Sequence, residues 1–209
     1  MHTAFALILA VAFLGTPARG QTEADRLAEV LGLRSGSAVA DVGAGGGDFA
    51  LAFAARVGAG GRVYATELDA GKLDEIRARA KQAGLGNVTA VEAQVAATGL
   101  PTACCDAVLL RDVYHHLTEP AAIDRDLLRA MKPGAVLVVV DFPPTWYLRP
   151  FTPAGVGAER AHHGIEREAA LAELLAAGFE RVRVIEPWSV RWLAPDPYAL
   201  VVRKPGAAP

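Results

Sequence analysis

Two short stretches of this sequence carry residue types that could bind a ligand or move a proton. Residues 39–50 read VADVGAGGGDFA, an apolar run that ends in Asp41 and continues with four glycines in positions 43–47. Glycine has no Cβ, so such a loop lets the backbone approach a ligand closely. Residues 111–117 read RDVYHHL and place a carboxylate beside two imidazoles. Side chains of these types serve as general bases when they lie next to a substrate.

The order of apolar and amphipathic segments predicts the elements that position these stretches. Short apolar strands are expected between helices, at 38–42, 62–67, 87–93, 106–112 and 134–142. This alternation predicts a parallel sheet with helices on both faces. Residues 180–187 and 197–205 form two closing strands, and the link between them is too short for a crossover helix. We therefore predict an α/β fold: a doubly wound, mostly parallel seven-stranded sheet that ends in an antiparallel hairpin.

The spacing of the glycines indicates which class of ligand the loop could bind. In a doubly wound sheet the ligand lies outside the carboxyl ends of the strands, where the loop after 38–42 is expected. A dinucleotide fingerprint is G-x-G-x-x-G/A, but its third small residue is replaced here by Asp48. The spacing present is G-x-G-x-G, over Gly43, Gly45 and Gly47. This difference disfavours a nicotinamide oxidoreductase.

Four segments together resemble the class I S-adenosylmethionine-dependent methyltransferases. They are DVGAGGG, VYATELD, LPTACCDAVLLRDVYHHL and RAMKPGAVLVVVDF, and the resemblance covers residues 22–204. It implies that S-adenosylmethionine is the cofactor and that Glu67 accepts two charge-assisted hydrogen bonds from the ribose hydroxyls. The cofactor-binding residues that it implies are Asp41, Gly43, Ala44, Gly45, Gly47, Glu67, Leu68, Gln94, Val95 and Arg111.

One position departs from the family pattern. After the third strand the family usually has an aspartate that bonds the adenine amino group, whereas this chain has Gln94 followed by Val95. The Gln94 carbonyl can accept the same hydrogen bond without a charge. Adenine recognition is therefore expected to be weaker, or to depend on backbone groups.

Candidate catalytic residues follow the fourth strand. Asp112 and His115 are candidate bases, while Arg111 and Tyr114 are candidates for orienting the cofactor or the substrate. The alternative is that the paired histidines pack against the next helix. No metal site is expected, because His115 and His116 should diverge and no cluster of ligands is seen around them.

The segment 143–165 is rich in proline and glycine, and loops of this length often form lids or binding loops. Its candidate substrate contacts, with Tyr114 of the preceding segment, are Trp146, Tyr147, Arg149 and His163. An apolar, aromatic lid favours a small hydrophobic or planar acceptor. The alternative is that these aromatic side chains only cover the edge of the sheet.

Composition limits the partners. The 209 residues are 52% hydrophobic and carry a formal net charge of −2, enough for one well-packed domain. Charges of both signs are spread along the chain, so we expect no nucleic acid partner. The expected partner is a small-molecule acceptor, and the sequence leaves the oligomeric state open.

The N-terminus predicts export. Residues 4–15 are apolar but too short to cross a bilayer comfortably, and Ala18 and Gly20 precede a plausible cleavage site before Gln21. We expect a signal peptide at 1–20 and a methyltransferase domain at 21–209, in the periplasm or outside the cell and without stable membrane insertion. The alternatives are an uncleaved N-terminal membrane anchor and an amphipathic helix on the domain surface.

The only cysteines are Cys104 and Cys105. Adjacent cysteines cannot reach the usual Cα separation of a disulfide without a strained eight-membered ring. We therefore expect two small, half-buried side chains at the start of a strand.

Two functions from different classes remain open. The first is an exported methyltransferase that acts on a small molecule. The second is an exported binding or scaffold protein that retains the methyltransferase fold without activity. Export favours the second, because S-adenosylmethionine is made in the cytoplasm, and so does the missing adenine acid.

Overall fold

The computed structural model describes residues 22–160, 162–190 and 195–206, so the predicted signal peptide lies outside the described residues. The elements follow the predicted order closely. They are α1 Glu23–Val30, β1 Ala38–Val42, α2 Asp48–Val57, β2 Arg62–Glu67, α3 Ala70–Gln82, β3 Val88–Glu92, β4 Cys105–Arg111, η1 Tyr114–His116, α4 Pro120–Ala130, β5 Met131–Asp141, η2 Trp146–Phe151, η3 Ala158–Arg160, α5 Arg167–Ala177, β6 Glu180–Ile185 and β7 Tyr198–Arg203.

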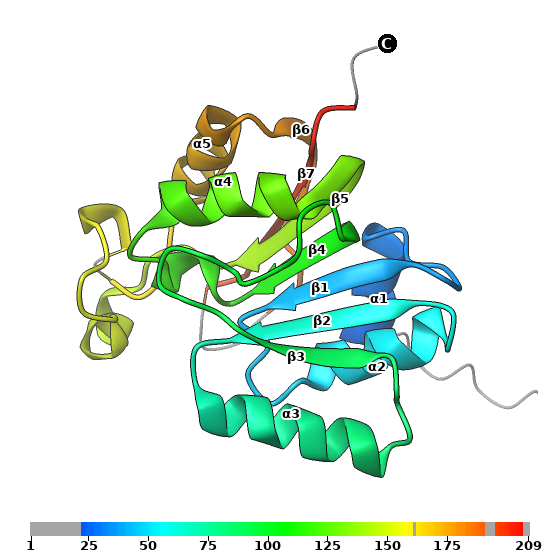
Figure 1. The fold of residues 1–209 in the computed structure, drawn as a ribbon. Helices are drawn as coiled ribbons and strands as arrows, with labels where there is room; N and C mark the ends of the chain where they lie inside the picture. The colour runs from blue at the N-terminus through cyan, green and yellow to red at the C-terminus, as the bar shows by residue number, and fades with distance from the viewer. Residues whose placement is uncertain (1–21, 161, 191–194, 207–209) are drawn as a thin grey trace, which may run out of the picture.

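The seven strands form one sheet in the order β3-β2-β1-β4-β5-β7-β6 (Figure 1). Strands β1 to β5 pair in parallel, whereas β7 is antiparallel to both β5 and β6. The predicted fold class and the closing hairpin are therefore confirmed. The insertion of β7 between β5 and β6 is an addition that the sequence pattern did not specify.

The helices cover both faces of the sheet (Figure 1). One core layer joins α4 and α5 to the sheet through residues such as Leu127 and Leu174. The other joins α1, α2 and α3 to the opposite face through Leu27, Phe53 and Ile76. Because helices cover both faces of the sheet, the central strands β1, β4 and β5 are buried on both sides. Their sequences therefore do not alternate regularly between apolar and polar residues.

The segment 143–165 is irregular as predicted, except for the two short 3₁₀ helices η2 and η3. It projects beyond the carboxyl ends of the strands, in yellow in Figure 1. Two backbone hydrogen bonds fold it back on itself: Thr145 N donates to His162 O at 2.9 Å, and His163 N donates to Arg160 O at 3.2 Å.

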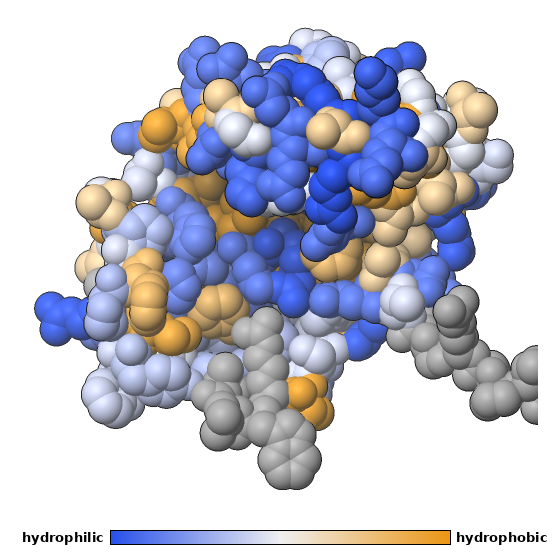
Figure 2. Space-filling view, turned by 90° about the horizontal axis from the view of Figure 1, so that it is seen from below, coloured by the Kyte–Doolittle hydropathy of each residue, from blue (hydrophilic) through white to orange (hydrophobic). Residues whose placement is uncertain are grey.

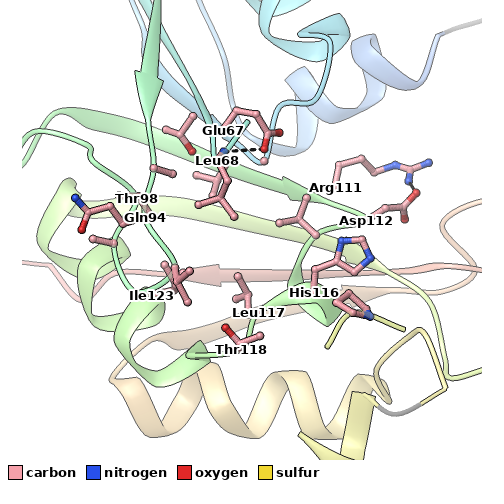
Figure 3. Close-up of a pocket in the computed structure, with 18 residues that line it drawn as sticks. Glu67, Leu68, Gln94, Thr98, Arg111, Asp112, His116, Leu117, Thr118 and Ile123 are labelled. Carbon is pink, nitrogen blue, oxygen red and sulfur yellow. Dashed lines mark hydrogen bonds and ion pairs between the residues drawn. The ribbon is translucent and has the colours of Figure 1, made fainter. Parts of the chain in front are cut away.

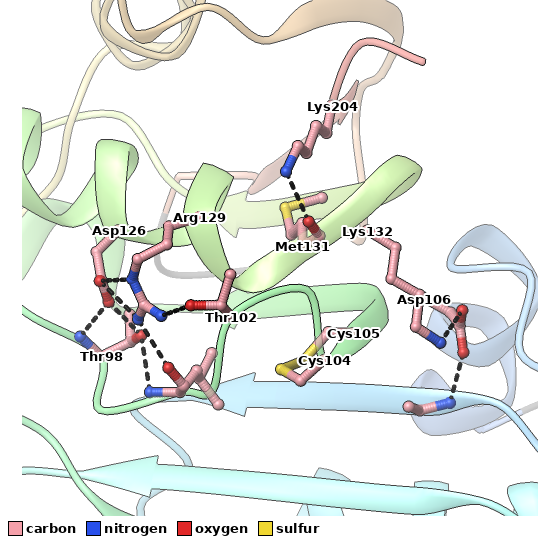
Figure 4. The surroundings of a disulfide bond; sticks show 12 residues. Thr98, Thr102, Cys104, Cys105, Asp106, Asp126, Arg129, Met131, Lys132 and Lys204 are labelled. Carbon is pink, nitrogen blue, oxygen red and sulfur yellow. Dashed lines mark hydrogen bonds and ion pairs between the residues drawn. A yellow bond between two sulfur atoms is a disulfide. The ribbon is translucent and has the colours of Figure 1, made fainter. Parts of the chain in front are cut away.

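The prediction for the cysteines was wrong, because Cys104 and Cys105 form a disulfide (Figure 4). Their Cα atoms are 3.8 Å apart, the separation of any two residues joined by a trans peptide bond. The start of β4 is irregular: Ala103 has a φ of 49°, and the pairing with β5 shifts between Cys105 and Ala107. The two side chains therefore do not alternate across the sheet as they would in a regular strand.

Within the described ranges, no helix is long and apolar enough to cross a membrane.

Candidate functional site

A cavity of about 560 Å³ opens at the carboxyl ends of the parallel strands. Residues that follow or end four of these strands contribute to it: Gly43 after β1, Glu67 in β2, Gln94 after β3 and Arg111 in β4 (Figure 3). Figure 2 shows apolar residues at the base of a hollow on one face of the molecule, with hydrophilic residues around it. The complete lining is Val42, Gly43, Thr66, Glu67, Leu68, Ala93, Gln94, Val95, Ala97, Thr98, Arg111, Asp112, Val113, His116, Leu117, Thr118, Ile123 and Pro153.

The glycine loop has a backbone that other residues would not adopt readily. Gly43, Gly45 and Gly47 have φ values of 69°, 53° and 86°. A Cβ at Gly43 would lie 2.6 Å from the Val113 side chain, and one at Gly47 would lie 2.9 Å from Ile76. The loop is therefore packed between Val113, which follows β4, and Ile76 of α3, while the space around Gly45 stays open.

Glu67 is fixed by the loop beside it. Its Oε2 accepts a hydrogen bond of 2.9 Å from Gly45 N, and its Oε1 accepts one of 2.8 Å from Leu68 N (Figure 3). A carboxylate has about four acceptor positions, so two remain for a ligand in the cavity. Glu67 thus lines the cavity at the end of β2, and its binding of the ribose stays a prediction.

Asp41 lies beneath the loop in a second, smaller cavity of about 300 Å³ that shares Gly43, Arg111 and Asp112 with the first. The side chain is 2% exposed, and its Oδ2 has no hydrogen-bond partner. Burial raises the pKa of Asp41 to about 7, and the carboxylate of Glu67 acts in the same direction. A buried carboxylate oxygen without a partner is costly, so this position suits a ligand that brings a cation.

Leu68 and Val95 keep 59% and 57% of their surface exposed and both line the large cavity. Gln94 lies in the same lining, in a tight turn where its N donates to Ala97 O at 2.8 Å. Exposed apolar side chains at a cavity mouth suit a planar ring better than they suit water. These residues lie where the resemblance placed the adenine contacts.

Arg111 and Asp112 separate the two cavities and line both. Nε of Arg111 donates to Glu23 at 2.8 Å, which ties β4 to the start of α1, and Nη1 pairs with Asp112. Trp188 Nε1 also donates to Glu23, at 2.8 Å. Asp112 has a φ of 57°, unusual for a residue with a side chain and frequent at functional sites.

His115 lines neither of the two cavities. It is 1% exposed, its Nδ1 lies 2.8 Å from Asp141 Oδ1, and its backbone N donates to Asp141 Oδ2 at 3.0 Å. His116 takes its place in the cavity lining (Figure 3). Burial lowers the pKa of His116 to about 4, and the neighbouring His115 and His163 rings add to the effect. The 3₁₀ turn η1 decides which imidazole faces the cavity.

Tyr114 does not contact the site. It is fully buried in the core, and its hydroxyl donates to Asp124 of α4 at 2.9 Å. The expectation that it orients a substrate is wrong for this reason: η1 turns the side chain inward, beneath α4. Burial raises the pKa of the Tyr114 hydroxyl further above its usual range.

The predicted aromatic lid does not line the cavity either. Trp146 and Tyr147 are exposed, as is Arg149, because η2 turns these side chains toward solvent. Among the described residues of the segment 143–165, only Pro153 lines the large cavity. The apolar wall of the cavity instead includes Leu117, which follows η1, and Ile123 of α4.

The prediction that His115 and His116 diverge without a cluster around them was wrong. Their ring centroids are 4.1 Å apart, and His163 of the following segment joins them at 4.7 Å from His115 and 5.3 Å from His116. The sequence pattern also missed Thr98, Thr118 and the apolar residues of the cavity wall. Only the doubled histidine was a visible signal for His116, and nothing local linked it to His163.

Comparison with known proteins agrees with this geometry. Residues 40–139 match the family described as "Methyltransferase domain". Over 115 residues the chain is 32% identical to the ubiquinone/menaquinone biosynthesis C-methyltransferase UbiE of Pseudomonas putida. That alignment covers 54% of this chain and 45% of the relative, so it spans less than half of the relative's length.

Solved structures share the fold. A S-adenosylmethionine-dependent methyltransferase of Aquifex aeolicus superposes with a TM-score of 0.72 at 22% identity, over 88% of this chain and 90% of that one. Phosphoethanolamine N-methyltransferase 2 of Haemonchus contortus, solved with S-adenosyl-L-methionine, gives 0.67 at 15% identity, over 86% and 51%. The glycine loop, the acid that ends β2, the matched domain and the shared fold together support a class I S-adenosylmethionine-dependent methyltransferase.

Proposed function

We propose that the protein transfers a methyl group from S-adenosylmethionine to a small-molecule acceptor. The observation that carries this proposal is the placement of Asp41 and Glu67 on either side of the glycine loop. Glu67 has acceptor positions left for a vicinal diol, and the unpartnered Asp41 Oδ2 suits a ligand's ammonium group. Leu68 and Val95 suit an adenine ring. The residues present therefore fit this cofactor.

The bound cofactor supplies a methyl group on a sulfonium, and the chain's own residues position the reactants. Methyl transfer is an in-line displacement, so positioning and exclusion of water contribute most of the rate. Val113, Leu117, Ile123 and Pro153 form an apolar wall of the cavity. This wall excludes water from the acceptor and favours an apolar or planar molecule.

Asp112 is the candidate base if the acceptor atom starts protonated. It lines both cavities, whereas the other predicted base, His115, lies behind the cavity wall. A carboxylate next to the acceptor could take up the released proton. We therefore propose that His115 does not contact the substrate.

The name of the Pseudomonas relative supports a finer proposal. That protein is a C-methyltransferase of ubiquinone and menaquinone biosynthesis. An acceptor carbon in a planar, apolar ring would suit the wall formed by Leu117 and Ile123. We propose acceptors of this chemical class for the first assays.

The function has a direct test. Calorimetry on the purified chain should show binding of S-adenosylmethionine and of its demethylated product, and no binding of NAD. Incubation with the cofactor and candidate acceptors should then give a product heavier by one CH₂, about 14 Da, in mass spectrometry. Binding of NAD without binding of S-adenosylmethionine would contradict the assignment.

The inactive scaffold is the second candidate and the structure does not favour it. A protein that had lost the cofactor would have no need of a buried carboxylate at Asp41 whose Oδ2 has no partner, because the hydrogen bond with the Ala50 backbone offsets only part of the burial that raises its pKa. Binding of the cofactor without any methylated product across the acceptor series would revive this candidate.

We further propose that the protein is exported, with cleavage before Gln21. The support is the apolar run at 4–15 followed by the small residues Ala18 and Gly20. Intact mass of the protein recovered from its native cell should correspond to a chain that starts at Gln21. A full-length product in the cytoplasm would contradict export, and a full-length product in the membrane fraction would indicate the anchor.

A further inference from the structure

Three of the five histidines in the sequence gather at the edge of the large cavity. His115 and His116 come from η1, and His163 comes from the segment before α5. One ring nitrogen from each lies within 4.8 Å of the other two. The proposed transfer of a methyl group needs none of these side chains.

Two of these imidazoles have a buried nitrogen without a partner. They are Nε2 of His115 and Nδ1 of His163. His115 is 1% exposed, so its lone nitrogen has no access to bulk water. Buried polar groups are nearly always paired, and an unpaired one in a native fold calls for an ion, a water or a ligand.

Asp141 fixes how His115 presents its free nitrogen. A carboxylate can only accept, so the Nδ1 of His115 carries the hydrogen that points to Asp141 Oδ1, 2.8 Å away. The Nε2 of His115 then carries a lone pair, aimed at the cluster. Asp141 also accepts from the backbone N of His115 and of Phe142, at 3.0 and 2.8 Å, so it is itself held firmly. A carboxylate behind an imidazole is the usual outer support of a metal-binding histidine.

The loop holds His163 in a conformation that needs support. Its φ is 52°, a left-handed value that few residues with a side chain adopt. The neighbouring Gly164 cannot be replaced easily, because a Cβ there would lie 2.7 Å from Pro143 O. The backbone therefore brings this side chain over His115.

We propose that His115, His116 and His163 bind a divalent metal ion of the zinc class, with Asp141 as the outer carboxylate. Imidazole ligands suit zinc and its neighbours, and three of them leave a fourth position open. Because His116 lines the cavity, the fourth position faces the acceptor. Tetrahedral bonds of about 2.1 Å place ligand nitrogens about 3.4 Å apart, so the cluster closes by a small rotation of the exposed His116.

Calorimetry with Zn²⁺ on the purified chain tests this site without any cofactor or acceptor. One ion should bind per chain, and His163→Ala and His116→Ala should each weaken binding at least about 100-fold. The matched control is His162→Ala, whose exposed side chain adjoins the cluster but does not belong to it. This variant should bind zinc like the unaltered chain.

Absence of zinc binding, or binding that both cluster variants retain, would overturn the proposal. If His163→Ala does not fold, as judged by circular dichroism, the exposed His116→Ala still decides the question. Asp141→Asn adds a separate readout, since loss of an outer carboxylate typically weakens metal binding 10–100-fold while leaving the ligands in place. These measurements stand whether or not the protein transfers methyl groups.

Discussion

Glu67→Ala should weaken the binding of S-adenosylmethionine by about ten-fold to about 150-fold. The carboxylate is expected to accept two hydrogen bonds from the ribose, and bonds to a charged group contribute roughly 1.5–3 kcal/mol each. Half of the combined contribution of the two bonds, about 1.5–3 kcal/mol, corresponds to a loss of affinity of about ten-fold to about 150-fold. The variant also removes the acceptors of Gly45 N and Leu68 N, which loosens the loop that surrounds the cofactor. Calorimetry at constant salt and pH measures the change.

Two variants control this experiment. Glu92→Ala removes an exposed carboxylate at the paired position of β3, which does not line the cavity, and should bind normally. Glu67→Gln keeps one acceptor oxygen and should fall between alanine and the natural residue. If Glu67→Ala binds normally, the ribose contact is misplaced. Asp69 is a poor replacement, because it caps α3 by accepting from Gly71 N and Lys72 N.

Asp41→Asn should stabilise the free protein at alkaline pH and weaken cofactor binding. Burial raises the pKa of Asp41 from 3.8 to about 7. An acid with a raised pKa in the folded state contributes stability that is complete below pH 3.8 and is lost as the pH rises through about 7. Asparagine has no charge to bury, so the variant should have a higher melting temperature than the unaltered chain at pH 8.5. Near pH 4 the two melting temperatures should be almost equal. The gain is at most about 4 kcal/mol, at 1.36 kcal/mol per pKa unit.

The same substitution, Asp41→Asn, should weaken cofactor binding although it stabilises the free protein. At pH 8.5 the ionised Asp41 can accept a charge-assisted bond from an ammonium group, and its loss should weaken affinity by about ten-fold or more. Asp124→Asn is the matched control. Burial also raises the pKa of Asp124 to about 7, but this residue lies in α4 and accepts from Tyr114, away from both cavities. The Asp124→Asn variant should alter the pH dependence of the melting temperature and leave the affinity for the cofactor unchanged.

A lower melting temperature of Asp41→Asn than of the unaltered chain at pH 8.5 would contradict the proposed burial of an ionised group. Unchanged cofactor affinity would remove Asp41 from the binding site and leave it a structural residue.

The sequence predicted the positions of the glycine loop and of the acid that ends β2 better than the positions of the side chains that follow β4. Gly43, Gly45 and Glu67 lie where the pattern indicated, since the two glycines belong to the loop that follows β1 and Glu67 ends β2. In such a sheet the carboxyl ends of the strands meet at one edge, so their chain position is enough to bring them together. Gln94 and Val95, the expected adenine contacts, line the cavity by the same rule.

Prediction failed where a turn sets the direction of a side chain. Tyr114, His115 and His116 are consecutive, yet one is buried under α4, one lies behind the wall and one lines the cavity. No periodicity describes a three-residue 3₁₀ turn, because a single turn is too short to show a repeat. The aromatic side chains of η2 were misplaced for the same reason.

By itself, the sequence determined the strands, the helices, the closing hairpin and the glycine loop, because apolar periodicity and the backbone freedom of glycine act over a few residues. Only the tertiary structure decided which distant residues meet. It inserted β7 between β5 and β6, paired Arg111 with Glu23 of α1, and brought His163 onto the two histidines of η1. These contacts depend on how whole elements pack, and the packing is a property of the complete chain that no local stretch records.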